Sequence, residues 1–251
     1  MADTLTMANI NLFAVIRNLE DLCELDNEAK SLIKDKNISL EFFIKNGSKG
    51  FLNFESGKCR FTKEDQSCDI KLFFKSPQHF NDMINGKANP IPTKGITKIN
   101  FLKNEFTKLT ERLSFYLKPT DNLLADKNYF KINTYLTAYT AFFAIAQIGN
   151  TDKIGKINAS RIPDGIISIS VAEGPCVYLE VKNGHIEAHK GSVASPRAYM
   201  IFDSLKTANG LLNGKLDSYT CIGDGKIQVK GFIPMIDNMN KILAMVPSYL
   251  K

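Results

Sequence analysis

The sequence predicts an α+β fold made of two tandem copies of one domain, each with five strands and several helices. Residues 71–87 match residues 199–215 at a constant shift of 128 positions. Segments that alternate apolar and polar residues, as half-buried strands do, recur in the same order in both halves. The 251 residues suit two domains, each able to bury a core. We place the first domain at 1–118 and the second at 123–251.

The repeated segment contains the signals of a strand followed by a capped helix. A serine after the strand is a favourable N-cap, and an Asn-Gly pair ends the helix because glycine enters the left-handed region at little cost. The repeat is far longer than the 20–50 residues of a solenoid unit, which favours tandem domains. Identical residues at the shift of 128 are Phe74 and Phe202, Ser76 and Ser204, Asn81 and Asn209, Asn85 and Asn213, Gly86 and Gly214, and Lys87 and Lys215.

The first copy begins with apolar residues at helical spacing over 9–24, and Asp26 can cap a short helix after it. Asn46-Gly47 and Ser56-Gly57 are hairpin signals between strands. Pro119 and its small polar neighbours predict a linker at 118–122. The elements expected after the first two helices are strands at 38–45, 49–54, 58–63 and 68–74, a helix at 77–85, a strand near 96–101 and a helix over 102–117.

The second copy repeats this plan. We expect a helix at 128–148, an irregular stretch to Asp164, four strands, a helix at 204–213, a fifth strand near 226–230 and a last helix at 232–246. Three methionines, Met235, Met239 and Met245, lie on or beside the apolar face of the last helix. Methionine adapts to irregular spaces, so this helix could form a wall that conforms to variable shapes. An ordinary core helix would give the same pattern.

Composition excludes several classes of function. The formal charge is +6, but the lysines are spread along the chain without an arginine-rich block, so nucleic-acid binding is not indicated. Five cysteines without a CxxC spacing predict neither a disulfide framework nor a zinc site. The first residues do not form a secretion signal, and the prediction is a cytoplasmic protein.

The segment 132–151 has no charged residue and is long enough to cross a bilayer. Its asparagines, threonines and glutamine are a polar load that is unusual for an isolated span. We therefore predict an enclosed helix and no stable membrane insertion, with a membrane anchor as the lesser alternative.

Catalytic motifs do not emerge from the sequence. The glycines around Gly223 and Gly214 fit no phosphate-binding loop. His185 and His189 would point the same way from a strand but lie about 13 Å apart, too far to share one metal ion. Neither cysteine nor carboxylate pairs form a recognisable catalytic set. The prediction is that the chain is not an enzyme and needs no cofactor or metal.

Four motifs of the second copy form its turns, caps and carboxy-terminal end within about residues 165–250. They are Asn183-Gly184-His185, Leu211-Leu212-Asn213-Gly214-Lys215, Gly225-Lys226-Ile227-Gln228-Val229-Lys230-Gly231 and Val246-Pro247-Ser248-Tyr249-Leu250. With these motifs the second copy resembles a sterol-carrier-protein (non-specific lipid-transfer) domain. The first copy is similar but weaker, since it keeps Asn85-Gly86-Lys87 and lacks the Lys-Gly after the fifth strand. The resemblance implies that the chain forms two tandem copies of a five-stranded, mostly antiparallel sheet covered by helices on one face. It also implies an apolar tunnel between sheet and helices that binds a fatty acyl chain, acyl-CoA or a sterol-like lipid without chemistry.

The expected partner is thus a hydrophobic small molecule. Apolar residues on the expected strands and helices of the second copy are candidates for the tunnel wall, although each could equally be plain core. They are Phe143, Ile167, Ile169, Leu179, Met200, Leu212, Met235, Met239 and Ile242.

A structural or protein-interaction module, including an accessory part of an enzyme, is the alternative function. In that case side chains fill the cavities. The oligomeric state stays open, and the two copies could pack as a pseudo-dimer around helix 128–148. Phenylalanines that could fill the interior of the first copy are Phe42, Phe43, Phe51, Phe54, Phe61, Phe73, Phe74 and Phe80.

Overall fold

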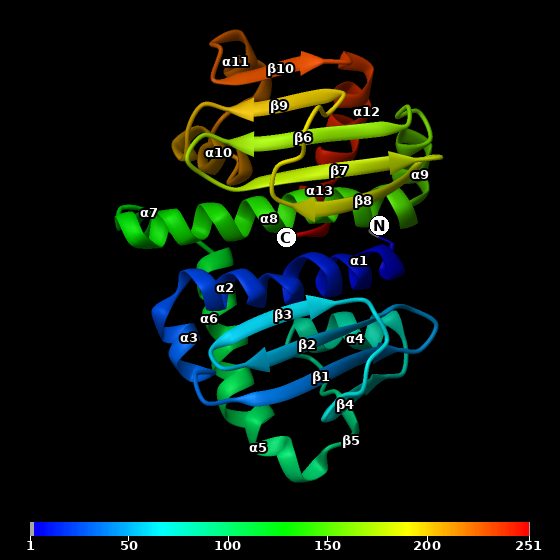
Figure 1. Ribbon diagram of the computed structural model, residues 1–251, viewed down its shortest axis with the longest axis vertical. Coiled ribbons are helices and arrows are strands. Elements are labelled where there is room, and N and C mark those ends of the chain that lie inside the picture. Colours follow the sequence, from blue (N-terminus) through cyan, green and yellow to red (C-terminus); the bar gives the residue numbers. More distant parts are fainter. Residues whose placement is uncertain (1–2, 251) are drawn as a thin grey trace. The chain divides into compact units, whose positions relative to one another are not determined.

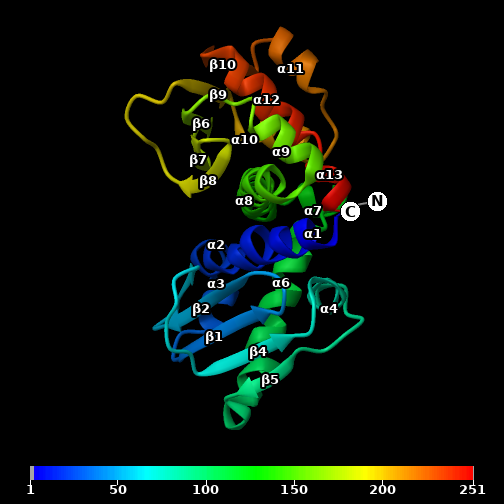
Figure 2. The same ribbon diagram turned by 90° about the vertical axis from the view of Figure 1, so that its right-hand side faces the viewer.

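The computed structural model describes residues 3–250. The chain divides into two compact units, Met1–Ile132 (unit 1) and Asn133–Lys251 (unit 2). Helix α8 (Lys127–Thr151) runs across this division. Each unit is built around one five-stranded sheet with helices on one side (Figures 1 and 2).

Unit 1 contains sheet A, with the strand order β3-β2-β1-β4-β5. Strands β1 and β4 are parallel, and the other neighbours are antiparallel. The strands are β1 (Asn37–Ile44), β2 (Lys49–Glu55), β3 (Lys58–Thr62), β4 (Ile70–Phe74) and β5 (Ile91–Lys94). The α-helices are α1 (Thr4–Ile10), α2 (Leu19–Leu25), α3 (Asn27–Leu32), α4 (Pro77–Ile84), α5 (Ile99–Phe101), α6 (Thr107–Leu117) and α7 (Asp121–Leu124).

Unit 2 contains sheet B, with the order β10-β9-β6-β7-β8 and one parallel pair, β6 with β9. The strands are β6 (Gly165–Val171), β7 (Cys176–Lys182), β8 (His185–Lys190), β9 (Ala198–Phe202) and β10 (Ile227–Gly231). Besides most of α8, the helices are α9 (Lys153–Ala159), α10 (Leu205–Leu212), α11 (Ser218–Gly223), α12 (Ile233–Leu243) and α13 (Val246–Tyr249).

The two sheets have the same strand order and the same single parallel pair, which confirms the predicted fold class. The repeated caps also form as predicted. Ser76 accepts a hydrogen bond from the backbone of His79, and Ser204 accepts one from Thr207, each at 3.2 Å. Gly86 and Gly214 follow these helices with φ of 69° and 70°, values that favour glycine.

Alternation along the strands separates the two faces of sheet A. Phe42, Phe54 and Phe74 are at most 1% exposed and share the face that carries Leu40. Phe43, Phe51 and Phe73 lie one position out of phase on the opposite face, where Phe43 stacks on Phe73. The expectation that all eight phenylalanines fill one interior is therefore wrong for these three.

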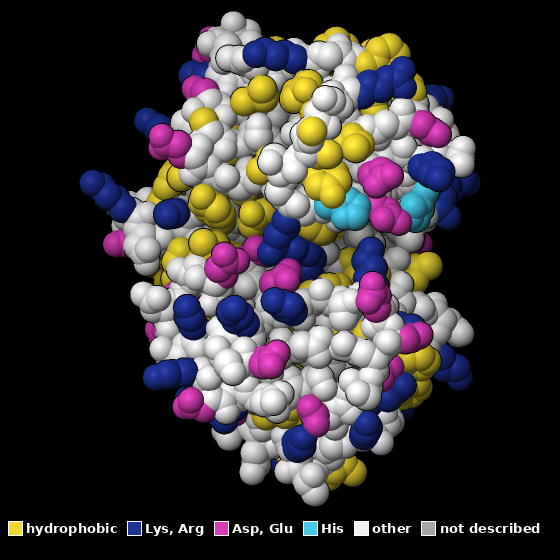
Figure 3. Space-filling model, viewed as in Figure 1, with side chains coloured by type: hydrophobic (Ala, Val, Ile, Leu, Met, Phe, Trp, Pro, Cys, Tyr) yellow, Lys and Arg dark blue, Asp and Glu magenta, His cyan; other side chains and the backbone are white. Residues whose placement is uncertain are grey.

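The outer face of sheet B is turned away from the helices. Tyr178, Tyr199 and Ile201 lie on it and are half-buried. Hydrophobic side chains gather over this face in Figure 3.

Two predicted segments are corrected. A strand near 96–101 is wrong, because β5 runs from Ile91 to Lys94 and residues 96–106 are helical. β5 contains Pro92, which an edge strand tolerates because no ladder bond is needed on its outer side. The irregular stretch before Asp164 is also wrong in part, since it contains helix α9, capped by Asp152.

The apolar segment 132–151 belongs to α8, where Asn133, Thr134 and Thr140 are buried. Within residues 3–250, none of the helices combines the length and the apolar character that a membrane crossing requires.

Candidate functional site

The candidate site is the apolar layer between sheet B and the helices of unit 2. Four predicted wall residues lie on the helix-covered face of the sheet. Ile167 pairs directly with Leu179 across β6 and β7, and Ile169 pairs with Met200 across β6 and β9. All four are at most 4% exposed. Strand alternation, which was visible in the sequence, is sufficient to place them together.

Helix α12 contributes the next three predicted residues. Met235, Met239 and Ile242 follow each other at helical spacing, and each is fully buried. α12 packs against β9 and β10. The methyl end of Met235 lies 3.6 Å from the position that a Cβ on Gly165 would occupy, at the start of β6. The two methionines therefore belong to the layer over the sheet.

The last two predicted residues lie less centrally. Phe142 places its ring near the sheet residue Phe202, at a centroid distance of 6.3 Å. Phe143 is one residue further along α8 and thus about 100° around the helix. Leu212 ends α10 and is only half-buried. The prediction named Phe143, although both phenylalanines belong to one broad apolar stripe in the sequence, and that pattern contains no signal that favours Phe142.

Side chains fill the layer closely. Eight of the nine predicted residues are at most 7% exposed, Leu212 being the exception. Two surface pockets of about 460 and 370 Å³ are formed by described residues, and both lie in unit 1. Neither is lined by any of the nine residues. A ligand between sheet B and α12 would therefore have to displace side chains or move a helix.

Buried asparagines fix the helices around this layer. The amide nitrogen of Asn209 donates to Asn133 Oδ1 at 2.7 Å and to Thr134 Oγ1 at 2.8 Å. Asn213 donates to the same Asn133 oxygen at 3.3 Å. These bonds attach α10 to α8. The sequence showed that an asparagine, Asn209, recurs in both repeats, but the pattern did not show that it joins two helices.

Unit 1 contains the equivalent attachment. Asn81, which matches Asn209 at the shift of 128, accepts a bond from Asn11 at 2.9 Å and donates to the backbone oxygen of Thr4 at 3.0 Å. In each unit, one buried asparagine of the repeat thus joins the helix after the fourth strand to the first helix, α4 to α1 in unit 1 and α10 to α8 in unit 2.

The Asn209→Ala variant is expected to lower the free energy of unfolding by about 2 kcal/mol, because it removes two short hydrogen bonds to buried polar groups of α8. Asn213→Ala is the matched control, with an expected loss of about 0.5 kcal/mol, since its bond is long and its side chain half-buried. Urea unfolding followed by circular dichroism measures both. Equal losses in the two variants would contradict this role for Asn209.

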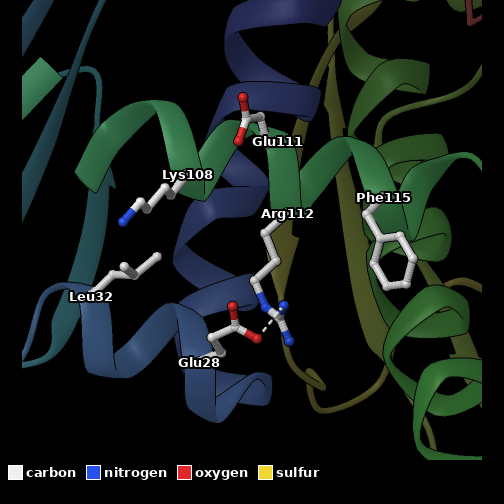
Figure 4. A pocket seen from close by; sticks show the side chains of 6 residues that line it. All are labelled: Glu28, Leu32, Lys108, Glu111, Arg112 and Phe115. Atoms are coloured by element: carbon white, nitrogen blue, oxygen red, sulfur yellow. Dashed lines mark ion pairs between the residues drawn. The ribbon is translucent and has the colours of Figure 1, made fainter. Parts of the chain in front are cut away.

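Arg112, which lines the larger of the two pockets (Figure 4), forms an ion pair with the buried Asp26. Asp26 is 4% exposed and accepts two bonds from Arg112, at 2.5 and 2.7 Å, and one from the Tyr116 hydroxyl at 2.7 Å. Arg112 also pairs with Glu28 at 2.5 Å. Burial raises the pKa of Asp26, but the bonds from Arg112, the backbone of Ala29 and Tyr116 outweigh it and hold that pKa below its usual value.

This pocket has mixed charge and is open to solvent. Glu28, Lys108, Glu111 and Arg112 line it together with the half-exposed Phe115. The Asp26 ion pair satisfies both carboxylate oxygens within the protein, so its position indicates a structural role.

Groups that could perform chemistry are dispersed. Three or more His, Cys, Asp or Glu side chains do not come together in a metal-binding arrangement anywhere in residues 3–250. His185, Glu187 and His189 share the outer face of β8, with His-to-Glu distances of 3.9 and 3.7 Å. Burial raises the pKa of the Cys59 thiol well above its usual value, which disfavours the reactive thiolate.

Neither a protein-family model nor a curated protein matches this sequence. The chain is similar to solved structures of sterol carrier proteins. A sterol carrier protein domain 2 from Helicoverpa armigera is 16% identical over 45% of this chain and 89% of its own, with a TM-score of 0.36. The sterol carrier protein 2 like 2 from Aedes aegypti is 20% identical over 42% of this chain and 95% of its own, with a TM-score of 0.32.

A third similar structure is the stereoselective inverting sec-alkylsulfatase Pisa1 from Pseudomonas sp. It is 13% identical over 59% of this chain and 29% of its own, with a TM-score of 0.26. Because the identities and TM-scores of all three are this low, these likenesses carry no argument about what the chain binds or whether it catalyses a reaction.

Proposed function

We propose that unit 2 binds an aliphatic ligand, such as a fatty acyl chain, between sheet B and helix α12, and carries it without chemical change. Unit 1 has a core of the same plan that its own aromatic rings fill. The proposal therefore assigns the ligand to one unit of the two.

The observation that supports this assignment is a difference between equivalent core positions. The two sheets share their strand order, and the pairings of β1 with β2 and β4 have the same register as those of β6 with β7 and β9, so inner-face residues of these strands have counterparts. At several of these positions unit 1 has a large aromatic ring and unit 2 has a smaller aliphatic side chain, whereas Phe74 of unit 1 matches Phe202 of unit 2. Two such pairs on the sheets are Phe42 and Ile169, and Phe54 and Val181. On the helices after β4 and β9, Phe80 of α4 corresponds to Ala208 of α10 at the shift of 128.

Helices α6 and α12, which cover the two sheets, also differ in the kind of side chain that they bury. The buried residues of α6 are Leu109, Leu113 and Tyr116, and the hydroxyl of Tyr116 is bound to Asp26. At the same spacing, α12 has Met235, Met239 and Ile242. Methionine has flexible, unbranched side chains that can withdraw from a space and return to it. Phe142 takes up part of the volume in unit 2, beside Phe202.

Binding would replace these internal contacts by contacts with the ligand. A dozen buried methylenes contribute about 10 kcal/mol at about 0.8 kcal/mol each. Association costs about 4 kcal/mol or more. The remaining 6 kcal/mol or so corresponds to a dissociation constant of roughly tens of micromolar, which suits a carrier that must release its ligand.

Native mass spectrometry of the freshly purified chain, followed by titration with a fluorescent fatty acid, tests this function. We expect one ligand per chain and saturable displacement by an unlabelled fatty acid. A stoichiometry of two would contradict the assignment to a single unit. If the purified chain carries no ligand and shows no saturable uptake of the fatty acid, the proposed function is contradicted.

The alternative function is a structural or protein-interaction module. The close packing of Ile167, Leu179 and Met239, each fully buried, favours it. Under this alternative the fluorescent fatty acid finds no site, and the methionines of α12 serve only as core. The same titration therefore separates the two functions.

We also propose a reducing compartment, the cytoplasm, for this protein. The five cysteines are free thiols in the structure, and four of them are buried. An oxidising compartment favours paired cysteines in secreted domains of this size.

A further inference from the structure

The segment 216–233 of unit 2 concentrates exposed apolar side chains. It contains α11, the strand β10 and the start of α12, and it holds half of the large apolar side chains that are exposed in residues 3–250. Single apolar residues are normal on a surface, whereas a group of them indicates an interaction site. The group, called the apolar cluster below, consists of Leu216, Tyr219, Ile222, Phe232 and Ile233, of which Tyr219 is 84% exposed.

Strand β10, in the middle of this segment, has an open edge. It stands at the end of sheet B and pairs only with β9, antiparallel (Figure 1). Lys226 and Phe232 form backbone hydrogen bonds of 2.9 Å with the residues directly after and before β9. Bonded positions alternate along an antiparallel pair, so the positions between them turn their N–H and C=O groups away from β9. These positions are Ile227, Val229 and Gly231.

The outward backbone groups need a further strand as partner. In the part of the chain that the structure describes, the N–H and C=O groups of Ile227, Val229 and Gly231 bond to no other segment. An unpaired edge of this kind is a template for an added strand. The equivalent edge strand of unit 1, β5, contains Pro92, which has no N–H and blocks such an addition. Of these two edges, only that of β10 can therefore accept a strand along its length.

We propose that β10 pairs antiparallel with β10 of a second copy of this chain, around a two-fold axis at Val229. In this register Val229 faces its own copy and Ile227 faces Gly231, so every outward backbone group has a partner. The pairing supplies about six backbone hydrogen bonds, two for each facing pair. An isologous contact closes on itself, and the assembly therefore ends at a dimer.

The same two-fold axis brings the apolar cluster together. In an antiparallel pair, the start of one strand lies beside the end of the other. Tyr219 and Ile222 precede β10 on α11, which packs against the strand, whereas Ile233 follows β10 and begins α12. Both helices lie on the same side of sheet B (Figure 2). The apolar residues before the strand in one copy therefore approach those after the strand in the other copy.

A second copy suits this edge better than an unrelated extended peptide. A stable interface needs about 800 Å² from each partner, which is more than the edge of a five-residue strand supplies. A peptide would bond to the backbone of β10 but would leave Tyr219 and Ile233 exposed. A second copy supplies both the strand and the apolar side chains that cover these residues.

Analytical ultracentrifugation of the full chain, from about 1 to 100 µM, tests the proposal. We expect a reversible rise of the mass with concentration, from 28.0 kDa to twice that value. A chain that stays monomeric over the whole range would overturn the proposal, and so would a chain that grows beyond a dimer.

Val229→Pro tests the strand edge itself. Proline removes the N–H that points outward and places its ring where the second strand would lie, while it deletes no bond to β9. We expect the dissociation constant of the dimer to rise by about tenfold or more. Circular dichroism checks that the variant is folded.

Two exposed residues of the apolar cluster provide a variant that does not alter the backbone. Tyr219→Ser with Ile233→Ser should raise the dissociation constant of the dimer by about tenfold. The matched control is Ile154→Ser with Ile157→Ser, at exposed isoleucines of α9 in the same unit, and it should dimerise as the unaltered chain does. Equal loss in the control would overturn the proposal, because it would show general apolar association.

Charge exchange tests the register of the pairing. In the proposed dimer, Gln228 of each copy lies opposite Lys230 of the other, and both residues are exposed. Gln228→Glu should therefore tighten the dimer by about threefold, whereas Gln228→Lys should weaken it by a similar factor. Adding Lys230→Glu to Gln228→Lys should restore it. A dimer that responds to none of these changes forms elsewhere on the chain, and that result would overturn the proposal.

The dimer is separable from the proposed function. The predicted wall residues of the ligand layer belong neither to the open edge of β10 nor to the apolar cluster. Uptake of a fluorescent fatty acid should be equal in Gln228→Glu and Gln228→Lys, which differ only in association. Failure to dimerise is therefore distinguishable from failure of the proposed function.

Discussion

The Met239→Trp variant is expected to lose uptake of a fluorescent fatty acid by a factor of about ten or more. Met239 is fully buried at the centre of the apolar residues that α12 turns towards sheet B. Tryptophan is larger and stiffer, so it would occupy volume that the methionine can vacate. Because the layer is already closely packed, we also expect the free energy of unfolding to fall by about 1–3 kcal/mol.

Two controls separate loss of the site from loss of the fold. Met239→Leu keeps the volume and should retain uptake within about threefold, with a stability loss below about 1.5 kcal/mol. Met83→Trp alters a half-buried methionine of unit 1 and should leave uptake unchanged. Unchanged uptake in Met239→Trp would contradict the placement of the ligand. Equal loss in Met83→Trp would show that uptake does not belong to unit 2.

The Asp26→Ala variant is expected to destabilise unit 1 by about 3 kcal/mol at neutral pH. Asp26 caps α3 through the backbone of Ala29, at 2.7 Å, and also holds Arg112 and Tyr116. Its removal leaves the guanidinium and the hydroxyl without their buried acceptor and deletes a helix cap. In urea, the unfolding transition of unit 1 should shift to a lower urea concentration, while the transition of unit 2 should not change.

Acid weakens the same interaction. The folded pKa of Asp26 lies below its ordinary value of 3.8, so its stabilising contribution is complete above that pH. The contribution is lost as pH falls through the lower, folded pKa. The difference in unfolding free energy between the unaltered chain and Asp26→Ala should therefore be constant from pH 5 to 7, or roughly so, and shrink towards pH 2. A difference that stays constant over the whole range would contradict this origin.

Much of the fold could be predicted because the same cap and turn signals occur in both copies of the repeat. Ser204 and Gly214 mark the start and end of α10, and the same signals recur at Ser76 and Gly86. The missed elements lack such signals. Gly155 inside α9 weakens the helical pattern, and the close approach to Ile148 that requires this glycine is a tertiary fact. Pro92 similarly concealed the edge strand β5.

The sequence predicted which residues of the candidate site share a face of a strand or helix, but it did not predict whether they enclose a cavity. Period two places Ile167 and Met200 on one face, and helical spacing places Met235 with Met239. Whether such residues surround a hollow or fill it depends on volumes summed over several elements, which a local pattern does not contain. The broad stripe of α8 left Phe142 and Phe143 equivalent for the same reason.

Methionine methyl groups provide the most direct measurement of the central claim, which is that an aliphatic ligand enters the layer between sheet B and α12. The chain, labelled with ¹³C at its methionine methyls, is titrated with a fatty acid and followed by NMR. The account predicts saturable changes in the methyl chemical shifts of Met200, Met235 and Met239 of unit 2 and unchanged shifts for Met7 and Met83 of unit 1. Shifts confined to Met7 and Met83, or no shifts at all, would contradict it.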